Sequence, residues 1–234
     1  MTPMRCIATG FLALALALSA KASGVIPGDQ GAGQIPNIPV WDEADHQTLL
    51  RTKLEASGTG PVFVLPVYTH CTMSCPVLAS RLVRETAQLA PGTPFRVLIF
   101  SFDPAEDAAS LRSFRAQQKL PANWILVRSS DREIRSFTDF FHYRVLTEGE
   151  VMLHTNQMFL LNHNLVWRAV FVNESWDVAD IRSWLKRVEA PGIIGWAIMN
   201  PAMIVYAGLG GMLLSLGLVL AAMLSRSKAR PNSA

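Results

Sequence analysis

The strongest chemical feature of this 234-residue chain is a pair of cysteines four positions apart, in the segment YTHCTMSCP at residues 68–76. One helical turn separates Cys71 from Cys75, so their sulfurs can meet in a disulfide or converge on one metal ion. A helix N-terminus also stabilises thiolate and lowers the pKa of a cysteine placed there. A purely structural disulfide is a weaker explanation, because closing so small a loop removes little entropy from the unfolded chain.

Two thiolates alone leave most metal ions incompletely coordinated, so a metal site needs a third ligand. Soft thiolates favour Cu(I), and a neutral imidazole suits both oxidation states of copper. Of the five histidines, His154 is the first choice. It opens the strand predicted to begin near Asn156, and we expect the start of that strand to approach the cysteine loop in the folded domain. We expect His46, His142 and His163 to be surface or packing residues.

The segments around the cysteines alternate between strand-like and helix-like patterns. Apolar runs predict buried parallel strands at residues 61–69 and 95–102 and a short strand at 124–127. Helical spacing of apolar residues predicts helices at 75–89, 105–119, 131–142 and 177–188. Residues 157–161 and 165–172 are predicted to form a hairpin around the turn 162–164. This order implies an α/β fold, a thioredoxin-like central sheet with helices on both faces. The cysteines lie at the carboxyl end of its first strand, where the active sites of such sheets collect.

Both ends of the chain are apolar. Residues 1–22 predict a secretory signal peptide, with Arg5 before an apolar stretch of about 14 residues and small residues on either side of Lys21. An uncleaved N-terminal anchor is the alternative. Residues 202–224 carry no charge and are long enough to cross about 30 Å of hydrocarbon, which predicts a transmembrane helix. The basic tail 225–234 would then stay on the cytoplasmic side.

The middle of the chain divides into a linker and one folded domain. Residues 23–39 are rich in Gly, Pro and Gln and are predicted to be a linker, and residues 40–189 are enough for one core. Of the 21 basic residues, two lie in the signal and three in the tail, whereas all 18 acidic residues lie between Asp29 and Glu189. The exported domain is therefore slightly acidic, and no basic patch indicates nucleic acid. We expect a single-pass protein of the inner (cytoplasmic) membrane, with its domain on the periplasmic side.

Three short motifs occur together in one order. The segment THCTMSCP at 69–76 resembles the THCPxxCP copper-site motif of the Sco/SenC family, the copper-binding thioredoxin-like proteins of cytochrome oxidase assembly. SFDPAED at 101–107 resembles the S-x-D-P-x-x-D segment of that family, and His154-Thr155 resembles its D-H-T/S strand. The resemblance covers roughly residues 40–189 and implies that Cys71, Cys75 and His154 are copper ligands. The chain departs from the family at Leu153, where an acidic residue is common, at the turn 162–164, and in its C-terminal anchor.

Four residues near these motifs have two interpretations each. His70 would tune the Cys71 thiolate or contact copper, or else serve a structural role beside the ligands. Met73 offers a soft thioether, although packing or partner contact is the simpler role of a loop methionine. Asp103 and Asp107 would orient a partner, or else Asp103 would cap a helix and Asp107 would be solvated.

Two functions from different classes follow. The first is a metallochaperone that binds one copper ion and passes it to a partner, the dinuclear copper centre of a respiratory oxidase subunit. The second is a thiol-disulfide oxidoreductase, in which Cys71 attacks and Cys75 resolves without any metal. A thioredoxin-like peroxidase is a weaker hypothesis, because no arginine stands beside Cys71 to activate peroxide. A non-catalytic binding module is the remaining alternative.

Overall fold

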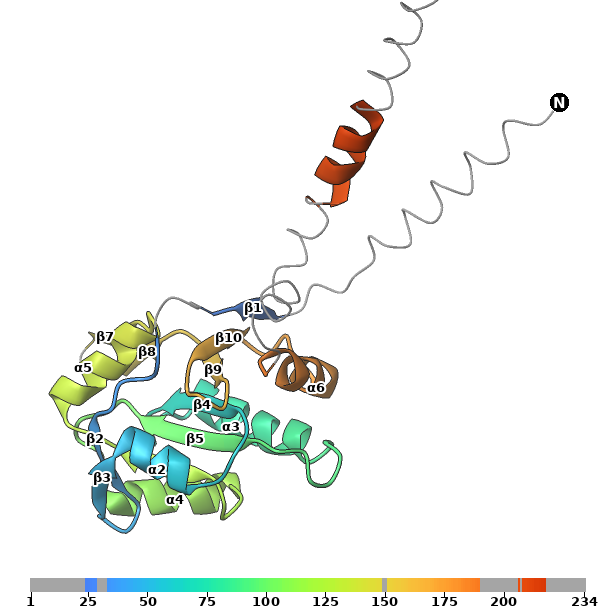
Figure 1. The fold of residues 1–234 in the computed structure, drawn as a ribbon. Helices are drawn as coiled ribbons and strands as arrows, with labels where there is room; N and C mark the ends of the chain where they lie inside the picture. Colours follow the sequence, from blue (N-terminus) through green and yellow to red (C-terminus); the bar gives the residue numbers. More distant parts are fainter. Residues whose placement is uncertain (1–23, 29–32, 149–150, 190–205, 207, 218–234) are drawn as a thin grey trace, which may run out of the picture. The chain divides into compact units, whose positions relative to one another are not determined.

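The computed structural model describes residues 24–28, 33–148, 151–189, 206 and 208–217 (Figure 1). Its main sheet has eight strands in the order β1-β10-β9-β4-β5-β6-β2-β3. These strands are β1 (Val25–Pro27), β2 (Pro39–Asp42), β3 (Gln47–Leu49), β4 (Val62–Val67), β5 (Arg96–Ser101), β6 (Ile125–Arg128), β9 (Gln157–Leu161) and β10 (Trp167–Val172).

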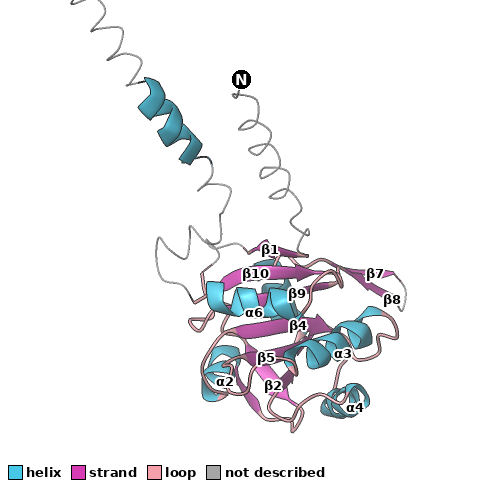
Figure 2. Cartoon of the chain, turned by 90° about the vertical axis from the view of Figure 1, so that its right-hand side faces the viewer, coloured by secondary structure: helices cyan, strands magenta, loops and turns pink. Residues whose placement is uncertain are grey.

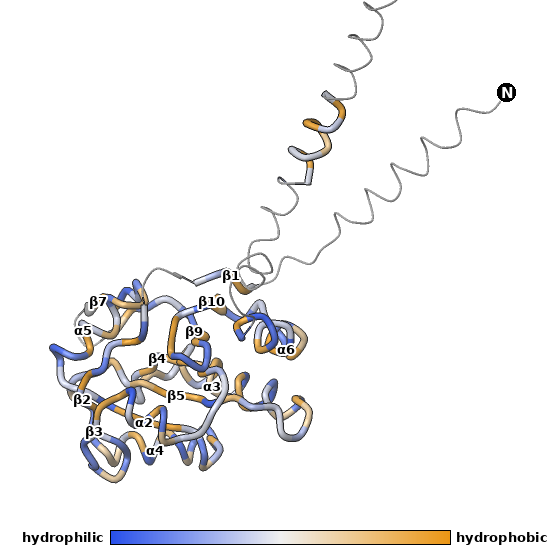
Figure 3. The backbone as a smooth tube through the Cα atoms, in the orientation of Figure 1, coloured by the Kyte–Doolittle hydropathy of each residue, from blue (hydrophilic) through white to orange (hydrophobic). Residues whose placement is uncertain are grey.

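The centre of the sheet is built from the apolar runs of the sequence. Strands β4, β5 and β6 are parallel, and β9 pairs with β4 in the antiparallel sense. Every residue of β4 and β5 is buried, as expected of strands covered on both faces, and Figure 3 shows these strands as mostly hydrophobic. The antiparallel pairing of β9 with β10 confirms the predicted hairpin.

Helices cover both faces of the sheet. They are α2 (Leu50–Ala56), α3 (Ser74–Thr86), α4 (Ala108–Gln118), α5 (Asp131–Phe140) and α6 (Val178–Arg187). Leu54 of α2 and Phe137 of α5 belong to one buried cluster with Val64 of β4. The Phe137 ring stacks on Phe100 of β5 with ring centroids 3.7 Å apart. These contacts place α2 and α5 on one face.

The opposite face packs against α3 and α6. Because side chains alternate along a strand, Phe63 points away from Val64. Its ring meets Phe171 of β10 edge-on, and Phe171 in turn meets Trp176, just before α6. The guanidinium of Arg81 in α3 lies 5.1 Å from the centre of the Trp176 ring. Helices on both faces and the α/β thioredoxin-like arrangement agree with the prediction from sequence.

A second, two-stranded sheet was not foreseen. It consists of β7 (Val145–Glu148) and β8 (Val151–His154), which pair in the antiparallel sense with Val145 opposite His154 (Figure 2). Val145 and Met152 pack partly against the main core. His154 therefore ends β8, and the prediction that it opens the next strand is wrong, because that strand, β9, starts only at Gln157.

Two local predictions also differ from the structure. Part of the predicted linker 23–39 belongs to the domain, since β1 pairs with β10 and Ile35 is fully buried. The helix predicted from residue 105 begins at Ala108. Asp107 caps it by accepting a hydrogen bond from the Ser110 backbone N–H, so the capping role expected of Asp103 belongs to Asp107. Asp103 instead closes a turn by accepting from the Ala105 N–H.

The two ends of the chain lie mostly outside the described residues. The predicted signal peptide 1–22 and the basic tail 225–234 fall there completely. Residues 208–217, inside the predicted span 202–224, are helical and belong to a second structural unit, Lys186–Ala234. Within the described parts of the chain, we find no helix that is both long enough and apolar enough to cross a membrane.

Candidate metal centre

The two cysteines lie where β4 gives way to α3. A backbone hydrogen bond from the Cys71 N–H to the Tyr68 carbonyl, 3.1 Å long, tightens the turn after the strand. Cys75 lies in the first turn of α3 and is 1% exposed, while Cys71 is 7% exposed. No side chain caps this helix at Met73. Its first N–H groups therefore remain available to the cysteines, and those of Met73 and Cys75 bond to the Cys71 sulfur. Both cysteines are free thiols.

The surroundings separate the acidities of the two thiols. The Cys75 thiol donates a hydrogen bond to the Cys71 sulfur, which together with the N–H groups at the start of the helix lowers the pKa of Cys71 to about 4, against the opposing effect of burial. The same hydrogen bond, reinforced by burial, raises the pKa of Cys75 far above the ordinary value of a thiol. Of the two cysteines, Cys71 is therefore the one whose thiolate form the surroundings favour.

His154 reaches the cysteines from the β7–β8 hairpin. Its Nε2 lies 3.6 Å from the Cys75 sulfur. Its Nδ1 lies 2.8 Å from the Tyr143 hydroxyl and 3.2 Å from the Thr155 carbonyl oxygen. Because a carbonyl only accepts hydrogen bonds, the Thr155 contact favours the tautomer with the proton on Nδ1. Nε2 then presents its lone pair to the sulfurs.

Aromatic rings hold the imidazole of His154 in place. The Phe102, Tyr143 and Tyr68 rings have centroids 5.2, 6.0 and 6.2 Å from that of His154. Tyr143 is 4% exposed, and burial, with the two cysteines nearby, raises the pKa of its phenol. The hydroxyl therefore stays protonated, and its oxygen remains a fixed hydrogen-bond partner of Nδ1.

The structure brings together the three residues predicted to bind a metal. The Cys71 and Cys75 sulfurs and a ring nitrogen of His154 all lie within 4.8 Å of one another. Two sulfurs and one imidazole form a donor set that suits Cu(I) and other soft cations. The two sulfurs come from the loop after β4 and from the first turn of α3, whereas the nitrogen comes from a hairpin 79 residues beyond Cys75 along the chain.

The other residues singled out in the sequence lie around this cluster. The His70 ring points toward Glu106, with 3.6 Å between Nδ1 and Oε1, and its side chain is 69% exposed. Met73 is 79% exposed. Tyr143 and Glu106 were not singled out from sequence. Glu106 lies inside the 101–107 motif, so that motif could have identified it from the sequence. The contact between Tyr143 and His154 depends on the register of the β7–β8 hairpin, which the sequence pattern does not give.

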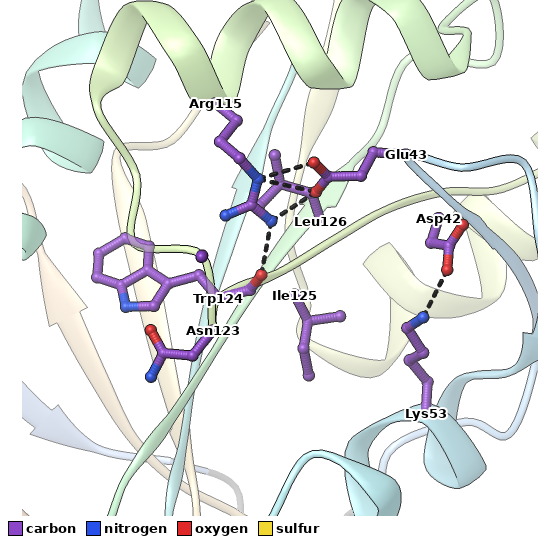
Figure 4. Close-up of a pocket in the computed structure, with 9 residues that line it drawn as sticks. Asp42, Glu43, Lys53, Arg115, Asn123, Trp124, Ile125 and Leu126 are labelled. Atoms are coloured by element: carbon purple, nitrogen blue, oxygen red, sulfur yellow. Dashed lines mark hydrogen bonds and ion pairs between the residues drawn. The ribbon is translucent and has the colours of Figure 1, made fainter.

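A separate cavity of about 400 Å³ lies between α4 and the loop after β2 (Figure 4). The Arg115 guanidinium pairs there with the Glu43 carboxylate, with 2.8 Å from Nε to Oε1. Lys53 pairs with Asp42 at 2.6 Å. Because the charged groups of these two pairs already satisfy one another, neither pair offers an unpaired charge to a ligand in this cavity.

The fold and the cluster define a class: thioredoxin-like proteins with a Cys-x-x-x-Cys pair before a helix and a histidine facing it. The SCO1/SenC family model matches residues 41–188. The chain therefore belongs to the SCO1/SenC family, as the motifs predicted. No protein of the curated set matches the chain by sequence.

Solved structures share the fold at low sequence identity. A protein of Aquifex aeolicus VF5 is 21% identical, with a TM-score of 0.62, 69% of this chain covered and 96% of that one. BsSco, a member of the Sco family of cytochrome c oxidase assembly proteins in which a disulfide switch was identified, is 18% identical, with a TM-score of 0.57 and coverage of 69% and 96%. Yeast Sco1 with copper bound is 11% identical, with a TM-score of 0.55 and coverage of 70% and 93%.

Proposed function

We propose that this protein is a membrane-tethered copper chaperone. It binds one copper ion through the Cys71 and Cys75 sulfurs and His154 Nε2, and it delivers the ion to the dinuclear copper centre of a respiratory cytochrome oxidase subunit. The observation that carries the proposal is the convergence of these three ligand atoms within 4.8 Å. Membership of the SCO1/SenC family supports the choice of copper.

The arrangement of the ligands suits an ion that is received and passed on. Three ligands leave a coordination position open, where a ligand of the acceptor protein can enter before the first ligands leave. Binding displaces the proton of the Cys75 thiol, so copper affinity rises with pH. Cys71 needs no such deprotonation above pH 4, because its pKa is lowered to about that value.

The proposal places the domain outside the cytoplasm. Residues 1–22 act as an export signal, residues 202–224 as the single membrane helix, and the basic tail 225–234 stays inside. The absence of net positive charge from the domain sequence supports this division, because the excess basic residues lie in the two terminal segments.

A titration of the reduced full-length protein with Cu(I), against a competing chelator, tests the ligand set. We expect one copper ion per chain, weaker binding in His154→Ala, and unchanged binding in the matched control His163→Ala, which lies on the turn between β9 and β10. A normal one-to-one site in His154→Ala would contradict the three-ligand model.

The acceptor is tested in the organism. Deletion of the gene should abolish the dinuclear copper centre of the oxidase, and the wild-type protein should restore it where Cys71→Ser does not. An intact copper centre in the deletion strain would assign a different target to the protein.

The lowered pKa of Cys71 favours a second candidate, a thiol-disulfide oxidoreductase. The Cys71 thiolate attacks a target disulfide and releases one target thiolate, giving a mixed disulfide. Cys75 then loses its proton and attacks the Cys71 sulfur, which releases the second target thiolate. The target gains two electrons, the protein retains a Cys71–Cys75 disulfide, and an external dithiol reductant regenerates it. Full activity in copper-free protein and in His154→Ala would favour this function over the chaperone.

A further inference from the structure

A second cluster of possible metal ligands lies beside the cysteine pair and shares none of its residues. A ring nitrogen of His70 and carboxylate oxygens of Asp103 and Glu106 lie within 4.8 Å of one another. His70 comes from the loop after β4, and the two acidic residues come from the loop after β5. The carboxyl ends of two adjacent parallel strands therefore bring these groups together.

The two carboxylates are unusual because they are buried beside each other. Asp103 is 9% exposed and Glu106 is 4% exposed. Two carboxylates so close in a partly dry site repel each other unless a cation or a proton neutralises one of them. Among the described residues, His70 is the only one that can pair with the Glu106 carboxylate as a cation. The His70 imidazole lies 3.6 Å from that carboxylate and is largely exposed.

The hydrogen bonds of Glu106 leave one of its oxygens unused. Oε1 accepts from the Thr69 backbone N–H at 2.6 Å and from the Thr69 hydroxyl at 2.7 Å. Oε2 is buried and has no hydrogen-bond partner. A buried, unpaired carboxylate oxygen is costly, and a bound cation is one of the few groups that satisfies it.

We propose that His70, Asp103 and Glu106 form a second cation site, which takes a borderline divalent ion such as Zn²⁺ or Cu²⁺. One imidazole and two carboxylates suit these ions, whereas the thiolate pair selects soft Cu(I). Ligands about 2.1 Å from a shared ion lie about 3 to 3.5 Å apart, and the 3.6 Å between His70 Nδ1 and Glu106 Oε1 is close to that separation. A cavity of about 330 Å³, lined in part by Thr69, His70 and Asp107, opens beside the His70 ring.

This site uses none of the three proposed copper ligands, although it adjoins them. An ion held by His70 would place positive charge one residue from Cys71 and stabilise its thiolate. The competing explanation is a proton on Glu106 in place of a metal ion, consistent with the burial that raises the pKa of this carboxyl. The two explanations differ in whether the site takes up metal.

The test measures Zn²⁺ uptake by equilibrium dialysis in the full-length protein carrying Cys71→Ser and Cys75→Ser, which removes the thiolates. We expect one Zn²⁺ per chain and at least a tenfold loss of affinity when His70→Asn or Glu106→Gln is added. His163→Asn is the matched control and should leave the affinity unchanged. Because the His70 side chain is exposed, His70→Asn should keep the fold, and circular dichroism checks this.

Absence of stoichiometric Zn²⁺ binding, or binding that His70→Asn and Glu106→Gln both leave intact, would overturn the second site and assign the neutralising role to a proton. A separate Cu(I) titration of the wild-type protein reports on the cysteine site alone. Loss of the second site would therefore appear only in the Zn²⁺ dialysis, and failure of the proposed copper function would appear only in the Cu(I) titration.

Discussion

The hydrogen bond between Tyr143 and His154 gives the most direct test of how the metal centre is built. The Tyr143 hydroxyl lies 2.8 Å from His154 Nδ1 and is held by a ring that is 4% exposed. Tyr143→Phe removes the hydroxyl and keeps the ring. His154 then retains only the longer contact of 3.2 Å with the Thr155 carbonyl.

The size of the effect follows from what is lost. One buried hydrogen bond contributes about 0.5 to 1.5 kcal/mol, or about 2- to 13-fold in an equilibrium constant. Groups that orient a metal-binding histidine typically change metal affinity by about 10- to 100-fold. The ranges overlap near tenfold, so we expect Tyr143→Phe to weaken Cu(I) binding about tenfold, and His154→Ala to weaken it further.

The assay is competition for Cu(I) between the reduced full-length protein and a chelator of known affinity. Tyr206→Phe is the matched control, because it removes a phenol hydroxyl from an exposed residue of the second unit. Wild-type affinity in Tyr143→Phe would refute the reasoning, since Thr155 alone would then suffice to orient the ring. A loss of Cu(I) affinity as large as that in His154→Ala would also refute the reasoning, because the hydroxyl would then be as important as the ligand itself.

Three further predictions concern the thiols, the core and the bound ion. The Cys71 pKa is depressed to about 4, so its thiolate persists above that pH and is lost as the pH falls through it. The rate at which iodoacetamide labels Cys71 should thus be nearly constant from pH 6 to 8, whereas the rate for an ordinary thiol rises about 80-fold over that range. A labelling rate that rises with pH as it does for an ordinary thiol would contradict this prediction. Phe137 is fully buried, so Phe137→Ala should lower the free energy of unfolding, measured by urea denaturation, by about 3 to 5 kcal/mol. The control Leu146→Ala, at an exposed position, should lower it by about 0.5 kcal/mol or less. Equal losses in the two variants would contradict the packing described. Cu(I) at 100 times its dissociation constant should stabilise the native protein by about 2.7 kcal/mol, seen as a rise in Tm that Cys75→Ser abolishes.

The central elements were predictable because their signals are local. Strands β4 and β5 are continuous apolar runs, and a run of that kind can be recognised without knowing its neighbours. The start of α3 was predictable for the same reason, since Cys75-Pro76 begins a helical pattern a short loop after a strand. The cysteine pair therefore could be placed in the fold from the sequence alone.

The rest of the site depends on pairings that local patterns do not report. Tyr143 and His154 are 11 residues apart, and they meet because Val145 pairs with His154 in a two-stranded sheet. Strands of four residues carry too few positions for a period of two to stand out. The same reason explains the predicted linker, in which the three-residue strand β1 gains its order from β10 and not from its own sequence.

The placement of His154 on the β7–β8 hairpin has a consequence for the kinetics of the site. The hairpin is a two-stranded sheet outside the main one, and such elements open at a lower free-energy cost than core strands such as β4, after which the cysteines lie. A copper ion bound to both parts would be a non-covalent cross-link between the hairpin and the main sheet. Substitutions that weaken the packing of Val145 or Met152 on the core would then shorten the lifetime of the bound ion without touching the metal.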